Sequence, residues 1–195
     1  LECIEIPGTE NAPVIVVMHG YGADCLDLLP MARILETPPG TRFLFPNGPM
    51  AVPIGPHVTG RAWFEIDIEA LEKARMEGTH RDLSNSTPKG MKDAREKIFE
   101  MLRALQIPLS KVVFCGFSQG AMLATQCALF SPENPKGLII WSGALLDQHT
   151  WKNKALNHKG LTFYQSHGNF DDLLSVDGGR DLHKLLVDNG LVGRF

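Results

Sequence analysis

The chain has 195 residues, and its 19 Lys and Arg side chains nearly balance 22 Asp and Glu side chains, giving a net charge of −3. This length predicts one domain, and 44% apolar residues with 21% charged residues predict a folded core rather than a disordered chain. The balanced charge argues against nucleic acid as a partner, and no apolar run approaches the ~18 residues that predict a transmembrane segment. Four cysteines are too few for a disulfide scaffold, which favours a reducing compartment, and we expect a cytoplasmic protein.

Short β-branched or aromatic runs alternate with longer amphipathic segments along the chain. Strands are predicted, in order, at residues 2–6, 14–18, 42–45, 112–117, 137–141, 162–165 and from 191 to 195. Helices are predicted at residues 27–35, 68–77, 88–105, 119–130 and 179–189. The third of these has Thr87 as its expected N-cap and Pro88 at its first helical position. Residues 46–60 are rich in proline and glycine and predict an irregular loop.

The alternation of strands and helices indicates parallel crossover units. It predicts an α/β fold with a mostly parallel central sheet, helices on both faces and no large cap domain. No repeat or linker divides the chain, so residues 1–195 are expected to form a single domain.

The strongest local signal is Gly116-Phe117-Ser118-Gln119-Gly120, which lies between a predicted strand and a predicted helix. A nucleophile elbow needs this setting: the serine occupies a turn so sharp that its backbone is strained, and the glycines two residues away on each side avoid collisions. Ser118 is therefore the candidate nucleophile. The alternative is a glycine-rich turn in which the serine only caps the helix.

A second signal, His19-Gly20-Tyr21-Gly22, follows the strand at 14–18. In acyl transfer the attacked carbonyl becomes an oxyanion, which needs two backbone N–H donors already in place. The residue after the nucleophile, Gln119, supplies one, and Tyr21 is the natural second donor. A dinucleotide-binding interpretation fails because the third glycine of that fingerprint is missing. We interpret His19 as a structural residue beneath the loop.

Five further segments share a family pattern with these two motifs. The loop at 19–22, the elbow at 116–120 and these segments resemble the carboxylesterase/phospholipase branch of the α/β-hydrolases, which includes acyl-protein thioesterases. They are Asp27-Leu28-Leu29, Phe45-Pro46-Asn47-Gly48-Pro49, Arg61-Ala62-Trp63-Phe64, Trp141-Ser142-Gly143 and His167-Gly168-Asn169-Phe170-Asp171. The chain departs from the thioesterase pattern at Asn47 and Gly48, and in a proline-rich stretch at 52–56.

The acid of a catalytic triad is expected in the loop after the strand at 162–165, because the triad of this fold runs serine, acid, histidine along the chain. Chain position and the resemblance both favour Asp171, with Asp172 as the alternative. His167 precedes the acid and aligns with a structural histidine of the family, so we do not expect it to be the base.

No histidine follows a strand after Asp171. The resemblance implies that the catalytic histidine lies on the loop after the final strand. Because the chain opens at Leu1 and stops at Phe195 inside a predicted strand, we expect the domain to be truncated at both ends, without the end of the last strand or the catalytic-histidine loop.

The expected substrate pocket lies around these loops. Its candidate lining residues are Gly20, Gly22, Trp63, Phe64, Phe170 and Leu174. The expected reaction requires no cofactor, and no metal-binding motif is present.

The sequence thus predicts a serine carboxylesterase that hydrolyses short-to-medium acyl esters, or thioesters, through an acyl-enzyme on Ser118. A homodimer is compatible with this prediction. The alternative from another class is an inactive hydrolase-fold protein that binds a ligand and lacks the catalytic histidine.

Overall fold

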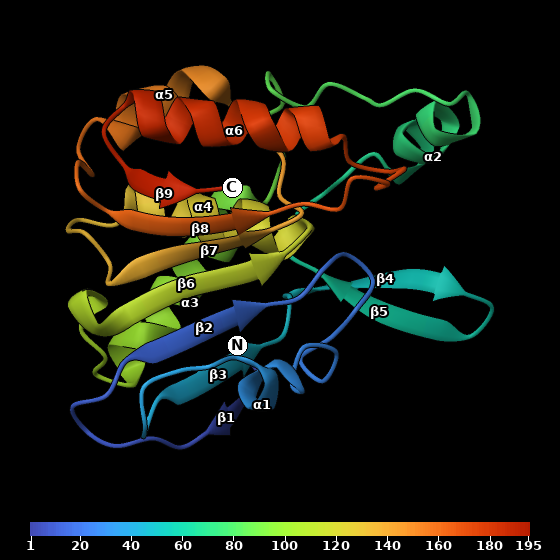
Figure 1. Ribbon diagram of the computed structural model, residues 1–195. Helices are drawn as coiled ribbons and strands as arrows, with labels where there is room; N and C mark the ends of the chain where they lie inside the picture. Colours follow the sequence, from blue (N-terminus) through green and yellow to red (C-terminus); the bar gives the residue numbers. More distant parts are fainter.

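A computed structural model describes residues 1–195, and a seven-stranded sheet forms its centre. Figure 1 shows how the helices are arranged around this sheet. The strand order is β1-β3-β2-β6-β7-β8-β9. The bounds are β1 Cys3–Ile6, β2 Val14–Met18, β3 Arg42–Pro46, β6 Val112–Phe117, β7 Gly137–Trp141, β8 Thr162–Ser166 and β9 Val192–Arg194. Only β1 runs antiparallel to its neighbour, which confirms the predicted mostly parallel sheet.

Helices cover both faces of this sheet, as predicted. Their bounds are α1 Met31–Ile34, α2 Ile68–Met76, α3 Met91–Ala104, α4 Gln119–Phe130, α5 Gln148–Ala155 and α6 Val176–Asp188. A cluster of 36 buried apolar residues joins α3, α4, α5 and α6 to one face, and a smaller cluster joins the α1 region to the other. None of the helices combines the length and apolarity needed to cross a membrane.

The central strand β2 illustrates why these residues form a buried strand. All five of its residues, Val-Ile-Val-Val-Met, are buried. Because side chains alternate across a strand, Val16 and Met18 join the larger apolar cluster, while Ile15 and Val17 join the smaller one. A strand in a sheet that is covered on both faces therefore requires a continuous apolar run.

The prediction of an irregular loop at residues 46–60 is wrong. Strands β4 (Met50–Gly55) and β5 (Val58–Ala62) form an antiparallel hairpin there, beside the carboxyl ends of the sheet strands (Figure 1). Both strands of this hairpin are edge strands, so a proline that lacks an N–H donor breaks no hydrogen bond to a third strand. The pairing register shifts between Pro53 and Gly55. Its second strand also bonds to the loop after β2, through Gly22 N–H to Arg61 O at 2.8 Å.

Three helix boundaries also differ from the prediction. The segment 27–35 is mostly turns, and only the four residues of α1 are helical. Helix α3 begins at Met91 rather than Pro88, because Gly90 adopts a left-handed φ of 89° and interrupts the helical path after Thr87 and Pro88. Helix α6 begins before its glycine pair, with the Ser175 hydroxyl accepting from the backbone N–H of Asp177.

Candidate active site

Ser118 lies in a strained turn between β6 and α4. Its backbone has φ 53° and ψ −117°, a region that non-glycine residues rarely occupy. The two flanking glycines make the turn sterically feasible. A Cβ atom at Gly116 would lie 2.2 Å from Gly120 O, and one at Gly120 would lie 2.1 Å from Met18 O. The turn therefore depends on side-chain-free positions on both sides of the serine.

The loop after β2 lies directly beside the serine. A Cβ atom at Gly20 would lie 3.7 Å from Ser118 Cβ, so the Gly20 backbone and the serine are neighbours. Gly22 has a φ of 81°, which turns the chain back toward the hairpin. Between them, the Tyr21 N–H donates to no other atom of the chain. Gln119 is the first residue of α4, where a backbone N–H has no acceptor within the helix.

The Gln119 side chain has a role that sequence reasoning missed. It is 1% exposed; its Oε1 accepts from Trp63 N–H at 2.9 Å, and its Nε2 donates to Phe64 O at 2.8 Å. The side chain thus ties the start of α4 to the segment after β5. No local sequence pattern indicates this contact, because its partners lie more than 50 residues away.

His19 is a structural residue, as predicted. Its Nδ1 lies 2.7 Å from Gly20 O and its Nε2 accepts from Gly48 N–H at 2.9 Å. These partners fix the neutral tautomer with the proton on Nδ1. Burial lowers the pKa of the imidazole, despite the hydrogen bond to Gly20 that opposes this shift. The indole N–H of Trp63 donates to the His19 carbonyl at 2.8 Å, so Trp63 lies beneath the same loop.

Asp171 lies in the loop after β8, and its carboxylate is held by the loop itself. Oδ1 accepts from the backbone N–H groups of Leu173 at 3.1 Å and Leu174 at 2.9 Å. Oδ2 lies 3.4 Å from Nε2 of His167, and the Asp171 side chain is 21% exposed. The alternative acid, Asp172, is 73% exposed and pairs with Arg75 on α2, so its carboxylate faces solvent.

None of the seven histidines has a hydrogen bond to Ser118. The loop after β8, residues 167–175, is here called the acid loop because it carries the candidate acid Asp171. The His167 side chain is fully buried, and its Nε2 lies 2.9 Å from Leu174 O, which commits that nitrogen to the acid loop. His80 contacts the Asp171 carbonyl rather than its carboxylate. The others are His19 beneath its loop, His57 in the hairpin turn, His149 on α5, His158 after α5 and His183 on α6. Ser118 and Asp171, the candidate nucleophile and the candidate acid, thus both follow the carboxyl ends of sheet strands, and no side-chain hydrogen bond joins a histidine to Ser118.

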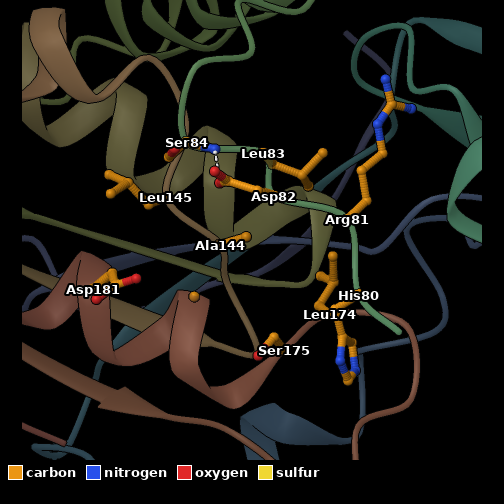
Figure 2. A pocket seen from close by; sticks show the side chains of 11 residues that line it. His80, Arg81, Asp82, Leu83, Ser84, Ala144, Leu145, Leu174, Ser175 and Asp181 are labelled. Carbon is orange, nitrogen blue, oxygen red and sulfur yellow. Dashed lines mark hydrogen bonds between the residues drawn. The ribbon is translucent and has the colours of Figure 1, made fainter. Parts of the chain in front are cut away.

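The predicted pocket residues separate in the structure. Phe64 lines a cavity of about 290 Å³ together with Met122 of α4. Leu174 lines a second cavity of about 210 Å³, shown in Figure 2, which lies under the segment that follows α2. Neither Trp63 nor Phe170 lines these cavities: Trp63 is 1% exposed in the core, and Phe170 is 98% exposed. The prediction that Phe170 lines the pocket is therefore wrong, because the acid loop turns its ring toward solvent.

A sequence profile of the Phospholipase/Carboxylesterase family matches residues 1–192. The chain belongs to the phospholipase/carboxylesterase family. This match spans the elbow, the loop after β2 and the acid loop. As a member of this family, the chain is an esterase-type hydrolase of the serine hydrolase superfamily with an α/β-hydrolase fold.

Relatives of this family member are named acyl-protein thioesterase 1. The chain is 25% identical to that protein of Candida albicans over 203 residues, covering 97% of this chain and 84% of the relative. It is 28% identical to that of Kluyveromyces lactis over 180 residues, covering 88% of this chain and 75% of the relative.

Solved structures of the same fold extend the comparison. The crystal structure of esterase PE8 superposes on this family member with a TM-score of 0.77 at 26% identity, covering 98% of this chain and 85% of that chain. The Bacillus cereus carboxylesterase has a TM-score of 0.69 at 20% identity, covering 99% of this chain and 82% of that chain. The second likeness supports the fold alone.

Proposed function

We propose that this chain is the hydrolase domain of a serine carboxylesterase that hydrolyses short-to-medium acyl esters through an acyl-enzyme on Ser118. The observation that carries the proposal is the strained backbone of Ser118, held between glycines that packing requires. Strain of this kind persists only where the surrounding structure enforces it, and it occurs preferentially at active sites. The Ser118 hydroxyl also makes no capping hydrogen bond to α4, so it is free to attack.

The oxyanion of the tetrahedral intermediate would be held by the backbone N–H groups of Tyr21 and Gln119. Support comes from the unpaired Tyr21 N–H and from the closeness of Gly20 to the serine. The start of α4 adds the positive end of a helix dipole, which favours negative charge at this point. Each such donor contributes about 3–4 kcal/mol to lowering the barrier.

Asp171 is the proposed acid, whose carboxylate would orient a histidine and stabilise its charged form. We place that histidine in residues that follow Phe195 in the full-length protein. The direction of β9 supports this placement: it runs parallel to β8 with Tyr164 paired to Arg194, so chain beyond Phe195 heads toward the edge that holds the acid loop.

The reaction then has two halves. The histidine removes the Ser118 proton as Oγ attacks the ester carbonyl, and it returns the proton to the leaving alkoxide when the C–O bond breaks. Water, deprotonated by the same histidine, attacks the acyl-enzyme and releases the carboxylic acid and free Ser118. Thioesters are the alternative substrate, because a thiolate leaves from the same intermediate and the relatives named above are thioesterases.

A second candidate function is ligand binding without catalysis. One observation favours it: Ser118 has no histidine partner within residues 1–195. Such a protein would keep the fold and the acyl site but would bind an ester without turnover.

Hydrolysis of p-nitrophenyl butyrate by the full-length protein tests the proposal. We expect turnover that falls at least about a thousandfold in Ser118→Ala and is unchanged in Ser110→Ala, an exposed serine at the opposite end of β6. Turnover that survives in Ser118→Ala would overturn the nucleophile. A full-length protein that binds the ester without hydrolysing it would favour the second function.

A further inference from the structure

The segment from Thr79 to Ser86 follows α2 and is here called the strap. Helix α2 ends at Met76, and Thr79 closes it with both its N–H and its hydroxyl donating to Ala74 O. The far end of the strap is fixed by two backbone bonds, from Asp147 N–H to Ser86 O and from Gln148 N–H to Ser84 O. The strap therefore bridges from α2 to the start of α5.

The strap lines a cavity together with the segments that follow β7 and β8. This cavity of about 210 Å³ is lined by strap residues together with Ala144, Leu145 and Leu174. In Figure 2 Leu174 is drawn next to His80 of the strap, and Leu145 lies farther away on the left. Leu174 belongs to the acid loop, and its N–H donates to the carboxylate of Asp171. The strap thus lies against the segment that carries the proposed acid.

Two polar contacts join the strap and α2 to the acid loop. Nε2 of His80 lies 3.0 Å from the backbone carbonyl oxygen of Asp171, and Nε of Arg75 lies 3.5 Å from Oδ2 of Asp172. A carbonyl only accepts, so Nε2 of His80 carries the proton and donates. The His80 contact is made to the backbone of the acid itself, one residue from the exposed ring of Phe170.

We propose that His80 is a positioning residue for Asp171: its Nε2–H holds the acid loop at the strap and thereby sets where the Asp171 carboxylate points. This inference rests on the proposed function, in which Asp171 orients the catalytic histidine. The carboxylate itself is bonded by N–H groups of residues 173 and 174, so the loop moves as a unit with its acid. Holding the carbonyl of residue 171 fixes that unit against the strap.

Positioning the acid loop in this way requires a hydrogen-bond donor at the distance of His80 Nε2 from the backbone, and it requires no charge. Glutamine places its Nε2 amide donor at a comparable distance from the backbone, whereas leucine fills the space without a donor. The pair His80→Gln and His80→Leu therefore separates the hydrogen bond from the bulk of the side chain. His149 on α5 offers a matched control, because it is also exposed and its side chain hydrogen-bonds to Asn153 within the same helix.

The other titratable and charged residues near His80 are the same in all of these variants. Arg75 and Asp172 form the neighbouring pair, Arg81 pairs with Asp67, and Asp82 and Asp181 line the same cavity. The Asp171 carboxylate and the buried His167 complete the set on the acid loop. Differences in a pH profile among the His80 variants therefore report the lost contact rather than these groups.

The experiment measures kcat, KM and the pH profile of p-nitrophenyl butyrate hydrolysis by the full-length protein. For His80→Leu we expect kcat to fall about two- to tenfold, the scale of one solvent-exposed hydrogen bond, with KM changed less than about twofold. The acid limb of kcat/KM should move to lower pH, because a displaced carboxylate stabilises the imidazolium less. His80→Gln should recover most of kcat, and His149→Leu should match the wild type.

Equal kcat and pH profile in His80→Leu and wild type would overturn the proposal. So would an equal loss in the Leu and Gln variants, since that result points to the shape of the ring rather than its donor. A thermal melt of each variant checks that the fold is intact; if His80→Leu does not fold, His80→Ala takes its place as the variant without a donor, and the same loss of kcat is expected. Failure of the proposed function is a separate result, because Ser118→Ala or Asp171→Asn would then retain full activity.

Discussion

Ser118 and Asp171 follow parallel strands of one sheet, yet different interactions hold the two loops. Around Ser118 the backbone is enclosed: Cys115 and Ala121 are fully buried, and the flanking glycines lie against neighbouring backbone. Around Asp171 the chain is open, with Phe170 98% exposed, and hydrogen bonds to the carboxylate and carbonyl provide the restraint.

This difference separates what mutations in each loop should do. Close packing cannot be relaxed locally, so changes beside Ser118 should disturb folding and catalysis together. Hydrogen bonds in an open loop contribute little to the global free energy of unfolding, so changes at Asp171 should disturb catalysis alone.

Asp171→Asn should give the largest effect on activity. Asparagine keeps Oδ1 as an acceptor for residues 173 and 174 but loses the charge that would stabilise an imidazolium. We expect kcat/KM for p-nitrophenyl butyrate to fall about 10⁴-fold, with the melting temperature nearly unchanged. Asp172→Asn, at the exposed neighbour, is the control and should stay within about threefold of wild type. A large loss in the Asp172 variant instead would reassign the acid.

Gly120→Ala should disrupt the enclosed side. The added Cβ would lie 2.1 Å from Met18 O, which forces β2 and α4 apart. We expect a loss of about 3 kcal/mol in the free energy of unfolding, measured by urea denaturation, together with lost esterase activity. Gly178→Ala is the control, because nothing lies within 4 Å of its new Cβ. An unaltered unfolding curve for Gly120→Ala would contradict the packing account of the elbow.

Gln119→Leu should give an intermediate effect on the same side. It leaves the Trp63 N–H and the Phe64 carbonyl buried without partners. The expected loss is about 2 kcal/mol in the free energy of unfolding. Gln148→Leu, at an exposed position on α5, should change stability by less than about 0.5 kcal/mol. Similar curves for the two variants would show that the Gln119 contacts do not hold the segment after β5.

Mild acid should give the smallest effect, a decrease in the free energy of unfolding that arises at His19, beneath the loop beside Ser118. Burial lowers the pKa of His19, so the unfolded chain binds a proton there at a higher pH than the native protein does. Stability is therefore full above the ordinary histidine pKa of about 6.5 and falls as pH drops below it. We expect a loss of about 1 kcal/mol from this group between pH 7.5 and 5.5. The pH dependence of urea unfolding should be shallower in His19→Asn; an equal or steeper slope would contradict this prediction.

The closely packed turn around Ser118 was also more predictable from the sequence than the open loop around Asp171. Glycine spacing between an apolar strand and an apolar helix is a local pattern, and it located the Ser118 turn that the structure contains. The parallel sheet followed from the same alternation of segments. The hairpin at 50–62 was missed because proline and glycine favour loops locally, whereas here pairing to the Gly22 loop stabilises strands.

Contacts between distant segments account for the rest of what the sequence did not reveal. Three features depend on residues far apart in the chain. They are the hydrogen bonds of the Gln119 side chain, the exposure of Phe170 and the contact of the strap with the acid loop. The cavities that Phe64 and Leu174 line likewise arise from how α2 and the strap lie on the sheet edge. Such arrangements leave no periodic signal in the residues themselves.

The nucleophile is tested most directly by covalent labelling of the full-length protein with a fluorophosphonate, followed by peptide mass mapping. This reagent phosphonylates activated serines, because Oγ attacks phosphorus and displaces fluoride. We expect one adduct, on Ser118, whose formation is slowed by a butyrate ester and abolished by Ser118→Ala. Continued ester hydrolysis with no adduct on Ser118, or with an adduct on another serine, would contradict it.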